Sequence, residues 1–150
     1  MMHVYLYFDS RHAVLVHDSI ISLTGGLDGI LHPNLLESCL EFIKDDGYYP
    51  EMSDKLCHLM FSLAKNHIFK DGNKRSSLAL GAYFLGINGY QLLIGTFITE
   101  MENIVLWVAD GKIHKEDFKV ILESFLIYGY INQESKALII HLLNASEECA

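Results

Sequence analysis

The sequence predicts an all-α fold, a compact bundle of about six to seven helices around a central buried helix. Apolar residues recur at helical spacing along most of the chain, and glycine-, asparagine- and proline-containing turns separate these segments. The segment 78–87 is apolar on nearly every side, which is typical of a helix that others surround. With 150 residues, of which 51% are apolar, the chain has the size and the core of a single domain.

A short N-terminal strand and a series of helices are the expected elements. Alternating side chains at 4–8 predict the strand. Residues that can cap a helix N-terminus, or a proline in the first turn, mark the helix starts, and glycine- or asparagine-containing turns mark the ends. Thr99 with Glu102, for example, fits a capping box. The helices are expected over about 10–23, 33–44, 51–66, 73–88, 99–110, 115–128 and from 132 onward.

We expect a cytoplasmic protein with no membrane span and no secretory signal. The three cysteines are far apart and form neither a metal-ligand pair nor a disulfide framework, which suits a reducing compartment. The N-terminus lacks a basic segment followed by an apolar one. The densest apolar run, 78–87, is shorter than a membrane span and is interrupted by Gly81 and Gly86.

The distribution of charge is more informative than its sum. The net charge of −8 argues against a nucleic-acid-binding protein, which needs a basic face. Within this acidic chain one segment is positive, because only Asp71 opposes Lys65, Lys70, Lys74 and Arg75. Such a run is usually a solvated helix face. The neighbouring residues decide between that interpretation and a site for an anionic ligand.

The positive segment contains the groups that phosphate binding requires. His67 is expected to close one helix and Asn73 to open the next. A helix N-terminus offers unpaired N–H groups and the positive end of the helix dipole, which attract anions. Gly72 allows a sharp turn and a close approach to a ligand. Lys74 and Arg75 fall in the first turn, where the dipole disfavours cations unless an anion is bound, and arginine suits bidentate contact with phosphate.

The same segment also contains groups for catalysis. A nucleotide triphosphate normally brings Mg²⁺, which takes oxygen ligands, and Asp71 is the only carboxylate available there. His67 is the only side chain of the segment that accepts a proton near neutral pH. Alone, His67 is most simply a histidine interacting with a helix C-terminus. Together with a carboxylate, a glycine turn and two cations, it predicts transfer of a phosphate group to a hydroxyl.

These residues resemble the motif of the Fic family. The family pattern is H-P-F-x-(D/E)-G-N-G-R-x-x-R between two helices, and the chain has H-I-F-K-D-G-N-K-R-S-S-L from His67 onward. It departs at Ile68, Lys74 and Leu78. These departures are similar to those of the Doc (death-on-curing) toxin branch, whose pattern is H-x-F-x-D-(A/G)-N-K-R. The resemblance covers residues 4–127 and makes the signal specific, because the motif falls in the expected helix–loop–helix context.

The resemblance implies one Fic/Doc domain over 1–150, with a helical tail at 128–150 to which the sequence assigns no role. It implies the toxin of a toxin–antitoxin pair, which transfers the γ-phosphate of ATP to a threonine or serine hydroxyl of a translation factor, elongation factor Tu, and inhibits protein synthesis. The roles that it implies are general base for His67, Mg²⁺ binding for Asp71, and phosphate binding for Gly72, Asn73, Lys74 and Arg75.

Two alternatives to this function stay open. One is adenylyl (AMP) transfer, the commoner Fic activity, against which Lys74 in place of glycine and Leu78 in place of arginine argue. The other is a non-catalytic Doc-like binding module, which the intact His67, Asp71 and Asn73 disfavour. The resemblance also implies a flap for docking the target, which we expect in the loop 44–50.

Two further interpretations concern other parts of the chain. His17 with Asp18 is equally a helix-surface pair or a functional pair. Many Fic proteins inhibit themselves through a helix of pattern (S/T)-x-x-x-E-(G/N). Here Thr96 and Glu100 are followed by Met101, so no internal inhibitor is evident. We therefore expect a separate antitoxin chain with a disordered C-terminal tail.

Overall fold

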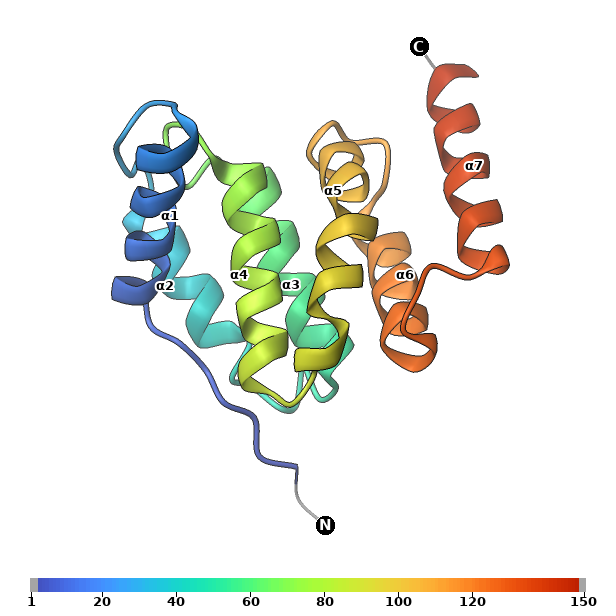
Figure 1. The fold of residues 1–150 in the computed structure, drawn as a ribbon, viewed down its shortest axis with the longest axis horizontal. Coiled ribbons are helices and arrows are strands. Elements are labelled where there is room, and N and C mark those ends of the chain that lie inside the picture. Colours follow the sequence, from blue (N-terminus) through green and yellow to red (C-terminus); the bar gives the residue numbers. More distant parts are fainter. Residues whose placement is uncertain (1–2, 149–150) are drawn as a thin grey trace.

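The computed structural model describes residues 3–148 and confirms the predicted all-α class (Figure 1). No strand occurs in this part of the chain, and an isolated antiparallel bridge joins Ile30 to Phe69. The elements are α1 (Ser10–Thr24), α2 (Pro33–Phe42), α3 (Met52–Lys65), α4 (Asn73–Ile87), the short 3₁₀ helix η1 (Gln91–Leu93), α5 (Ile94–Ala109), α6 (Lys115–Tyr128) and α7 (Gln133–Glu148).

The helices α3 and α4 form the centre of the bundle. The helices α1 and α2 lie on one side of them, α5 and α6 lie on the other, and α7 is outermost (Figure 1). Leu56, Leu63 and Phe84 are fully buried where the central helices meet. At Gly81 a Cβ atom would lie only 2.6 Å from Sδ of Met60, so a larger residue there would require the Met60 side chain between α4 and α3 to move. This position between neighbours explains why α4 is apolar on nearly every side.

Local signals at the helix ends agree with most predicted boundaries. Asp9 caps α1, because its side chain accepts a hydrogen bond from the backbone N–H of His12 at 3.0 Å. Asn132 caps α7 in the same way, through Ser135 N–H at 2.9 Å. The helix α6 begins and ends at the predicted residues, and Gly129 closes it in the left-handed conformation.

Two predicted elements are wrong. The N-terminal segment is extended but is not a strand, because its partner is a side chain: the Asn88 amide donates to Leu6 C=O at 3.0 Å and accepts from Leu6 N–H at 2.8 Å. The fifth helix does not start at Thr99. The helix α5 begins at Ile94, directly after η1, and the Thr99 hydroxyl donates to the Gly95 carbonyl within the helix at 3.1 Å.

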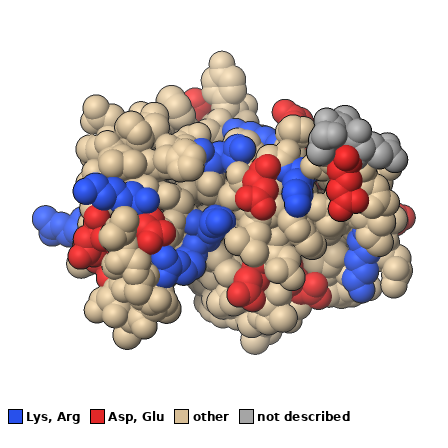
Figure 2. Space-filling view, turned by 90° about the horizontal axis from the view of Figure 1, so that it is seen from above, with Lys and Arg blue, Asp and Glu red and all other residues tan. Residues whose placement is uncertain are grey.

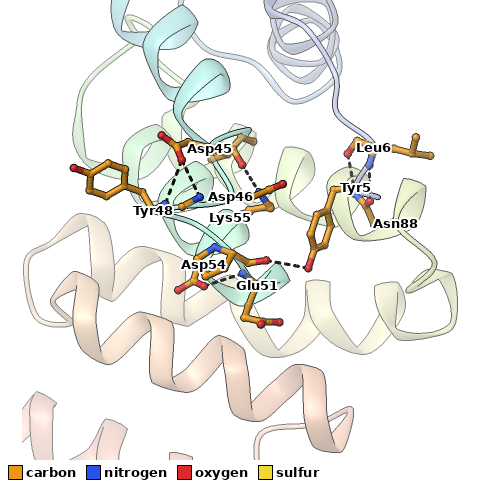
Figure 3. A network of polar contacts seen from close by, with 12 residues as sticks. Tyr5, Leu6, Asp45, Asp46, Tyr48, Glu51, Asp54, Lys55 and Asn88 are labelled. Carbon is orange, nitrogen blue, oxygen red and sulfur yellow. Dashed lines mark hydrogen bonds and ion pairs between the residues drawn. The ribbon is translucent and has the colours of Figure 1, made fainter. Parts of the chain in front are cut away.

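A buried lysine joins the N-terminal segment and the α2–α3 loop to α3 (Figure 3). The Lys55 ammonium donates to the Ile43 carbonyl and to Oδ1 of Asp46, both at 2.7 Å, and lies 4.9 Å from the ring centroid of Tyr5. Burial lowers the pKa of Lys55, but hydrogen bonds with Asp46 and Tyr7 outweigh it and raise the pKa above the ordinary value.

A second apolar stretch, Gln91–Ala109, is longer than the run at 78–87. Residues Gln91–Ala109 are long and apolar enough, by length and composition alone, to cross a membrane, so the expectation that no segment reaches that length is wrong. Isolated polar residues interrupt this apolar run and hide its length in the sequence. One face of α5 packs into the bundle, where Phe97, Met101 and Val108 are fully buried, as occurs for core helices of this composition.

Candidate active site

The predicted site is a short loop between α3 and α4, at the upper end of the bundle in Figure 1. Asn66 ends α3, and Gly72 precedes α4 in the left-handed conformation, with φ 79°. His67 also has a positive φ, 49°, and is the one non-glycine residue of the described chain that does. A non-glycine residue in this region is strained by about 1–3 kcal/mol, and such strain is frequent at active sites. The loop therefore imposes the conformation of His67.

Asn73 and the α1–α2 connection hold the loop in place. The Asn73 side chain accepts from Phe69 N–H at 3.0 Å and donates to Phe69 C=O at 2.8 Å. The backbone of Leu31 donates to the Ile68 carbonyl at 2.7 Å, and that of Lys70 donates to the Gly29 carbonyl at 3.0 Å. The amide of Asn73 thus holds the loop through its oxygen and one of its hydrogens. The backbone N–H and the second amide hydrogen of Asn73 remain for a phosphate.

The two oppositely charged residues of the motif contact the α1–α2 connection. The Asp71 carboxylate accepts hydrogen bonds from the backbone N–H groups of Leu27, at 3.1 Å, and Gly72, at 2.8 Å, and these lower the pKa of Asp71. The Arg75 guanidinium lies 3.7 Å from Asp71 and donates to the Thr24 hydroxyl and to the Gly25 carbonyl, the latter at 2.8 Å. Both charged side chains are about 40% exposed, at 43% and 39%, so a ligand can reach them.

The remaining predicted residues face solvent around the start of α4. His67 and Lys74 are exposed, as is Lys70, whereas Gly72 is buried. The first N–H groups of a helix have no partner within it, and no hydrogen bond joins those of Asn73 and Lys74 to another residue of 3–148. Figure 2 views this end of the bundle and shows basic side chains gathered there, with acidic side chains beside them. The loop and the first turn of α4 together thus provide an exposed base, unpaired N–H donors and exposed lysines.

A histidine of α1 lies beneath the loop. His17 is fully buried, and its Nε2 lies 2.7 Å from the Asp71 carbonyl. Its ring stacks on Phe69, with centroids 3.8 Å apart and planes 6° from parallel. Its Nδ1 lies 3.0 Å from the Asp18 carboxylate, a contact that becomes an ion pair when the ring carries both protons. Of the two interpretations left open by the sequence, the helix-surface pair is wrong for His17, because this side chain is interior and touches the site.

The expected position of the flap is also wrong. The loop 44–50 precedes α3 and His67 follows it, so they lie at opposite ends of a helix about 20 Å long at 1.5 Å per residue. The segment that adjoins the site is 25–32, which pairs with 68–70. Its glycine cluster was the available sequence signal. At Gly26, with φ 126°, a Cβ atom would lie 2.6 Å from Oδ2 of Asp71.

Asp71 fits the role of a magnesium ligand that shares the ion with a nucleotide. Each of its carboxylate oxygens accepts one backbone hydrogen bond and keeps lone pairs free. Within residues 3–148 no three histidine, cysteine or acidic side chains come together that could hold a metal ion by themselves. Mg²⁺ is commonly held by one or two carboxylates together with substrate phosphates and water, and one exposed carboxylate beside a phosphate site is consistent with that pattern.

Comparison with known proteins identifies the family. A family model described as the Fic/DOC family matches residues 7–85, which include α1, α2, α3, the loop and most of α4. The chain is 30% identical over 110 residues to "Protein kinase doc" of Escherichia phage P1, an alignment that covers 71% of this chain and 85% of that protein. It is 43% identical over 61 residues to "Toxin Doc" of Mycolicibacterium smegmatis, across 41% of this chain and 47% of that protein. The chain therefore belongs to the Fic/DOC family of ATP-using transferases, in its Doc branch of toxins.

Proposed function

We propose that the chain transfers the γ-phosphate of ATP to a threonine or serine hydroxyl of a translation factor and thereby inhibits protein synthesis. Elongation factor Tu is the candidate target by resemblance. The observation that carries the proposal is the exposed Lys74 in the first turn of α4, at a helix N-terminus whose first N–H groups are unpaired among the described residues, with the exposed His67 in the loop that leads into this helix. The printed name of the phage P1 relative, a protein kinase, supports the same reaction.

His67 would act as the general base. Its exposed imidazole can take the proton from a target hydroxyl, and the loop fixes the backbone from which the ring projects. The hydroxyl oxygen then attacks the γ-phosphorus. A new oxygen–phosphorus bond forms, the bond between the γ-phosphorus and the bridging oxygen breaks, and ADP leaves with that electron pair. The proton stays on His67 until it passes to solvent.

The start of α4 would bind the phosphates. The free N–H groups of Asn73 and Lys74 and the positive end of the helix dipole favour an anion there. Lys74 adds a mobile positive charge, and Arg75 can exchange its contacts with Thr24 and Gly25 for phosphate oxygens. Asp71 would hold the Mg²⁺ ion of the nucleotide, which neutralises phosphate charge when it is bound.

Two departures from the adenylyl-transferase pattern favour the γ-phosphate. Lys74 stands where a glycine would leave room for phosphates close to the helix, so its stem occupies part of that space and its ammonium attracts terminal oxygens. Leu78 stands in place of a second arginine and packs partly buried against the core, so it offers no phosphate contact. A difference of about 1.4 kcal/mol between two nucleotide orientations is enough to change their ratio tenfold.

The test follows an isotope label placed at one of two phosphate positions of ATP. The purified chain is incubated with elongation factor Tu and with ATP labelled at either the γ- or the α-phosphate, and the His67→Ala variant serves as the control. Label from γ-ATP alone in the protein, absent with the variant, is the expected result. Label from α-ATP would show adenylyl transfer. No label from either would leave the binding module as the better hypothesis.

Inhibition would come from an antitoxin chain, as the Doc relatives imply. The nearest internal candidate, Glu100, is in α5 and lines a cavity of about 320 Å³ between α5 and α7, together with Trp107 and Ile139. Among the described residues, Glu100 has no hydrogen bond or ion pair with the His67 loop. Glu100→Gly should therefore leave the activity of the isolated chain unchanged. Activation by this substitution would contradict the proposal of a separate inhibitor.

A further inference from the structure

We propose that His17 is a positioning residue for phosphate transfer, which fixes the backbone at Asp71 and Gly72 from beneath. The inference deepens the proposed function and rests on it, because it concerns the loop that would hold the nucleotide. His17 lies outside the nine-residue motif, on a different helix, and its side chain is fully buried. Its effect on a ligand would therefore pass through the loop rather than through direct contact.

The first support is the hydrogen bond between His17 and the site loop. Nε2 lies 2.7 Å from the carbonyl oxygen of Asp71. A carbonyl can only accept, so Nε2 carries the hydrogen and donates it. A backbone carbonyl that is removed from water and left without a hydrogen-bond partner destabilises the fold. His17 therefore satisfies a loop carbonyl that has no other hydrogen-bond partner among residues 3–148.

The second support is the close packing of the loop on α1. The His17 ring stacks on Phe69 with nearly parallel planes. On the other side of the carbonyl, a Cβ atom added to Gly72 would lie 3.1 Å from Cδ1 of Ile21 and 3.4 Å from Nε2 of His17. The Asp18 carboxylate lies 3.0 Å from Nδ1 and accepts a hydrogen bond from it when Nδ1 also carries a hydrogen. The loop is therefore tightly packed on α1, and the side chains of His17 and Ile21 set its distance from that helix.

The position of the Asp71 carbonyl matters because the same residue supplies three features of the site. Its carboxylate is the candidate magnesium ligand, its carbonyl is the anchor to His17, and its peptide leads directly into Gly72 and the N-terminus of α4. A shift of about 1 Å at reacting groups can reduce a rate about a hundredfold. A side chain that holds this peptide therefore contributes to the rate without touching the substrate.

The plain alternative is that His17 only fills the core, and the chain contains a control for it. His12 lies on the same helix and packs against Tyr83 in a tilted arrangement, with ring centroids 4.2 Å apart, and its buried Nε2 has no hydrogen-bond partner among the described residues. It is a histidine that packs without holding a loop. Substituting phenylalanine at each position keeps the aromatic bulk and removes the ring nitrogens, so only the His17 variant loses a hydrogen bond to the site.

The test compares three variants with the wild-type chain: His17→Phe, His17→Gln and His12→Phe. The glutamine amide keeps an N–H donor for the Asp71 carbonyl. We expect His17→Phe to speed amide hydrogen exchange at Phe69, Lys70 and Gly72 about tenfold or more and to slow phosphate transfer by a similar factor. His17→Gln should restore most of the protection from exchange and most of the transfer rate. His12→Phe should match the wild type in exchange and in transfer.

Two results would overturn the inference. One is that His17→Phe shows the same rates of loop amide exchange and of phosphate transfer as the wild type. The other is equal impairment of His17→Phe and His17→Gln, which would indicate packing rather than a hydrogen bond. If the variants do not fold, the wild-type chain still decides, because a buried Nε2–H should give a slowly exchanging histidine N–H resonance, and its absence would also overturn the inference. The exchange comparison needs no nucleotide, so a wild-type chain that transfers no phosphate would contradict the proposed function alone.

Discussion

The carboxylate of Asp71 reaches from the start of α4 to the backbone of Leu27, whose N–H donates a hydrogen bond to Oδ2 at 3.1 Å. This bond and the one from Gly72 N–H hold the pKa of Asp71 below its ordinary value, so the carboxylate stays ionised across the physiological range. One side chain thus joins the motif loop to the α1–α2 connection and offers free lone pairs to a cation. These two functions can be separated by substitution.

Asp71→Asn should weaken the magnesium-dependent part of ATP affinity and leave the fold intact. The amide oxygen can still accept from one backbone N–H, but the negative charge that attracts Mg²⁺ is lost. Titration calorimetry with ATP, with and without Mg²⁺, measures the difference. In the wild type Mg²⁺ should tighten ATP binding, and in the variant most of this gain should disappear. An ATP affinity that Mg²⁺ does not change in the wild type would contradict the assignment.

His67→Ala should abolish transfer with little effect on stability. Loss of a general base reduces a rate by about 10²–10⁴. The side chain is exposed, so the free energy of unfolding should change by no more than about 0.5 kcal/mol. Transfer assays and thermal unfolding of the same preparations check both statements. Turnover near the wild-type level in a folded variant would remove His67 from the mechanism.

Features of the fold that depend on neighbours in sequence were predicted well. The bounds of α6, the start of α1 and the buried α4 follow from spacing, capping residues and composition over a few turns. The start of α5 was missed because Thr99 and Glu102 have the residue types of a capping box, while the preceding turn at 91–93 continues directly into the helix.

Features that depend on tertiary arrangement were not predictable in the same way. The segment 4–8 alternates like a strand, but its partner is the Asn88 side chain, which no local pattern reveals. The order of elements places 44–50 at the far end of α3 from His67, but only the packing of the helices shows that 25–32 adjoins the site. His17 was noticed as a pair with Asp18, but its burial against the motif loop depends on how α1 packs. The site motif itself could be recognised because its residues are contiguous.

The buried Lys55 predicts a loss of stability at high pH. Its pKa is raised in the folded protein, so the folded state binds this proton more tightly than the unfolded state does. The resulting stability is complete below the ordinary pKa of 10.5 and is lost as pH rises through the folded pKa. Urea unfolding at pH values from 8 upward to about 11 should show this decline, and it should be weaker in Lys55→Met, which keeps an unbranched side chain without the charge.

The size of the Lys55 contribution can be measured at neutral pH. Lys55→Ala leaves a cavity in a fully buried position and removes the donor from the Ile43 carbonyl, so we expect a loss of about 2–4 kcal/mol. Asp46→Asn should lose much less, because the Asp46 side chain is 69% exposed and solvent screens the ion pair. Equal losses for the two substitutions would show that the ion pair, and not burial of the lysine, dominates.

Lys74 should decide which phosphate of ATP reaches the target hydroxyl. Its side chain is exposed in the first turn of α4, where no residue of the described chain pairs with it as an ion partner. An ammonium at a helix N-terminus is disfavoured by the helix dipole, by a few tenths of a kcal/mol, and a bound polyphosphate removes that disadvantage. The plain alternative is a solvated lysine that has no influence on nucleotide orientation.

Mass spectrometry of the modified target separates these possibilities. The wild-type chain should add a phosphate and release ADP. Lys74→Gly should lose this activity, and with Leu78→Arg as a second substitution the chain should gain some addition of AMP, because space and a second guanidinium then favour the nucleotide orientation that presents the α-phosphate. Lys70→Gly is the matched control, since Lys70 is an exposed lysine of the same loop outside the helix N-terminus. Addition of AMP by the wild-type chain would overturn the proposed kinase activity, and a kinase unaffected by Lys74→Gly would remove Lys74 from the choice of phosphate.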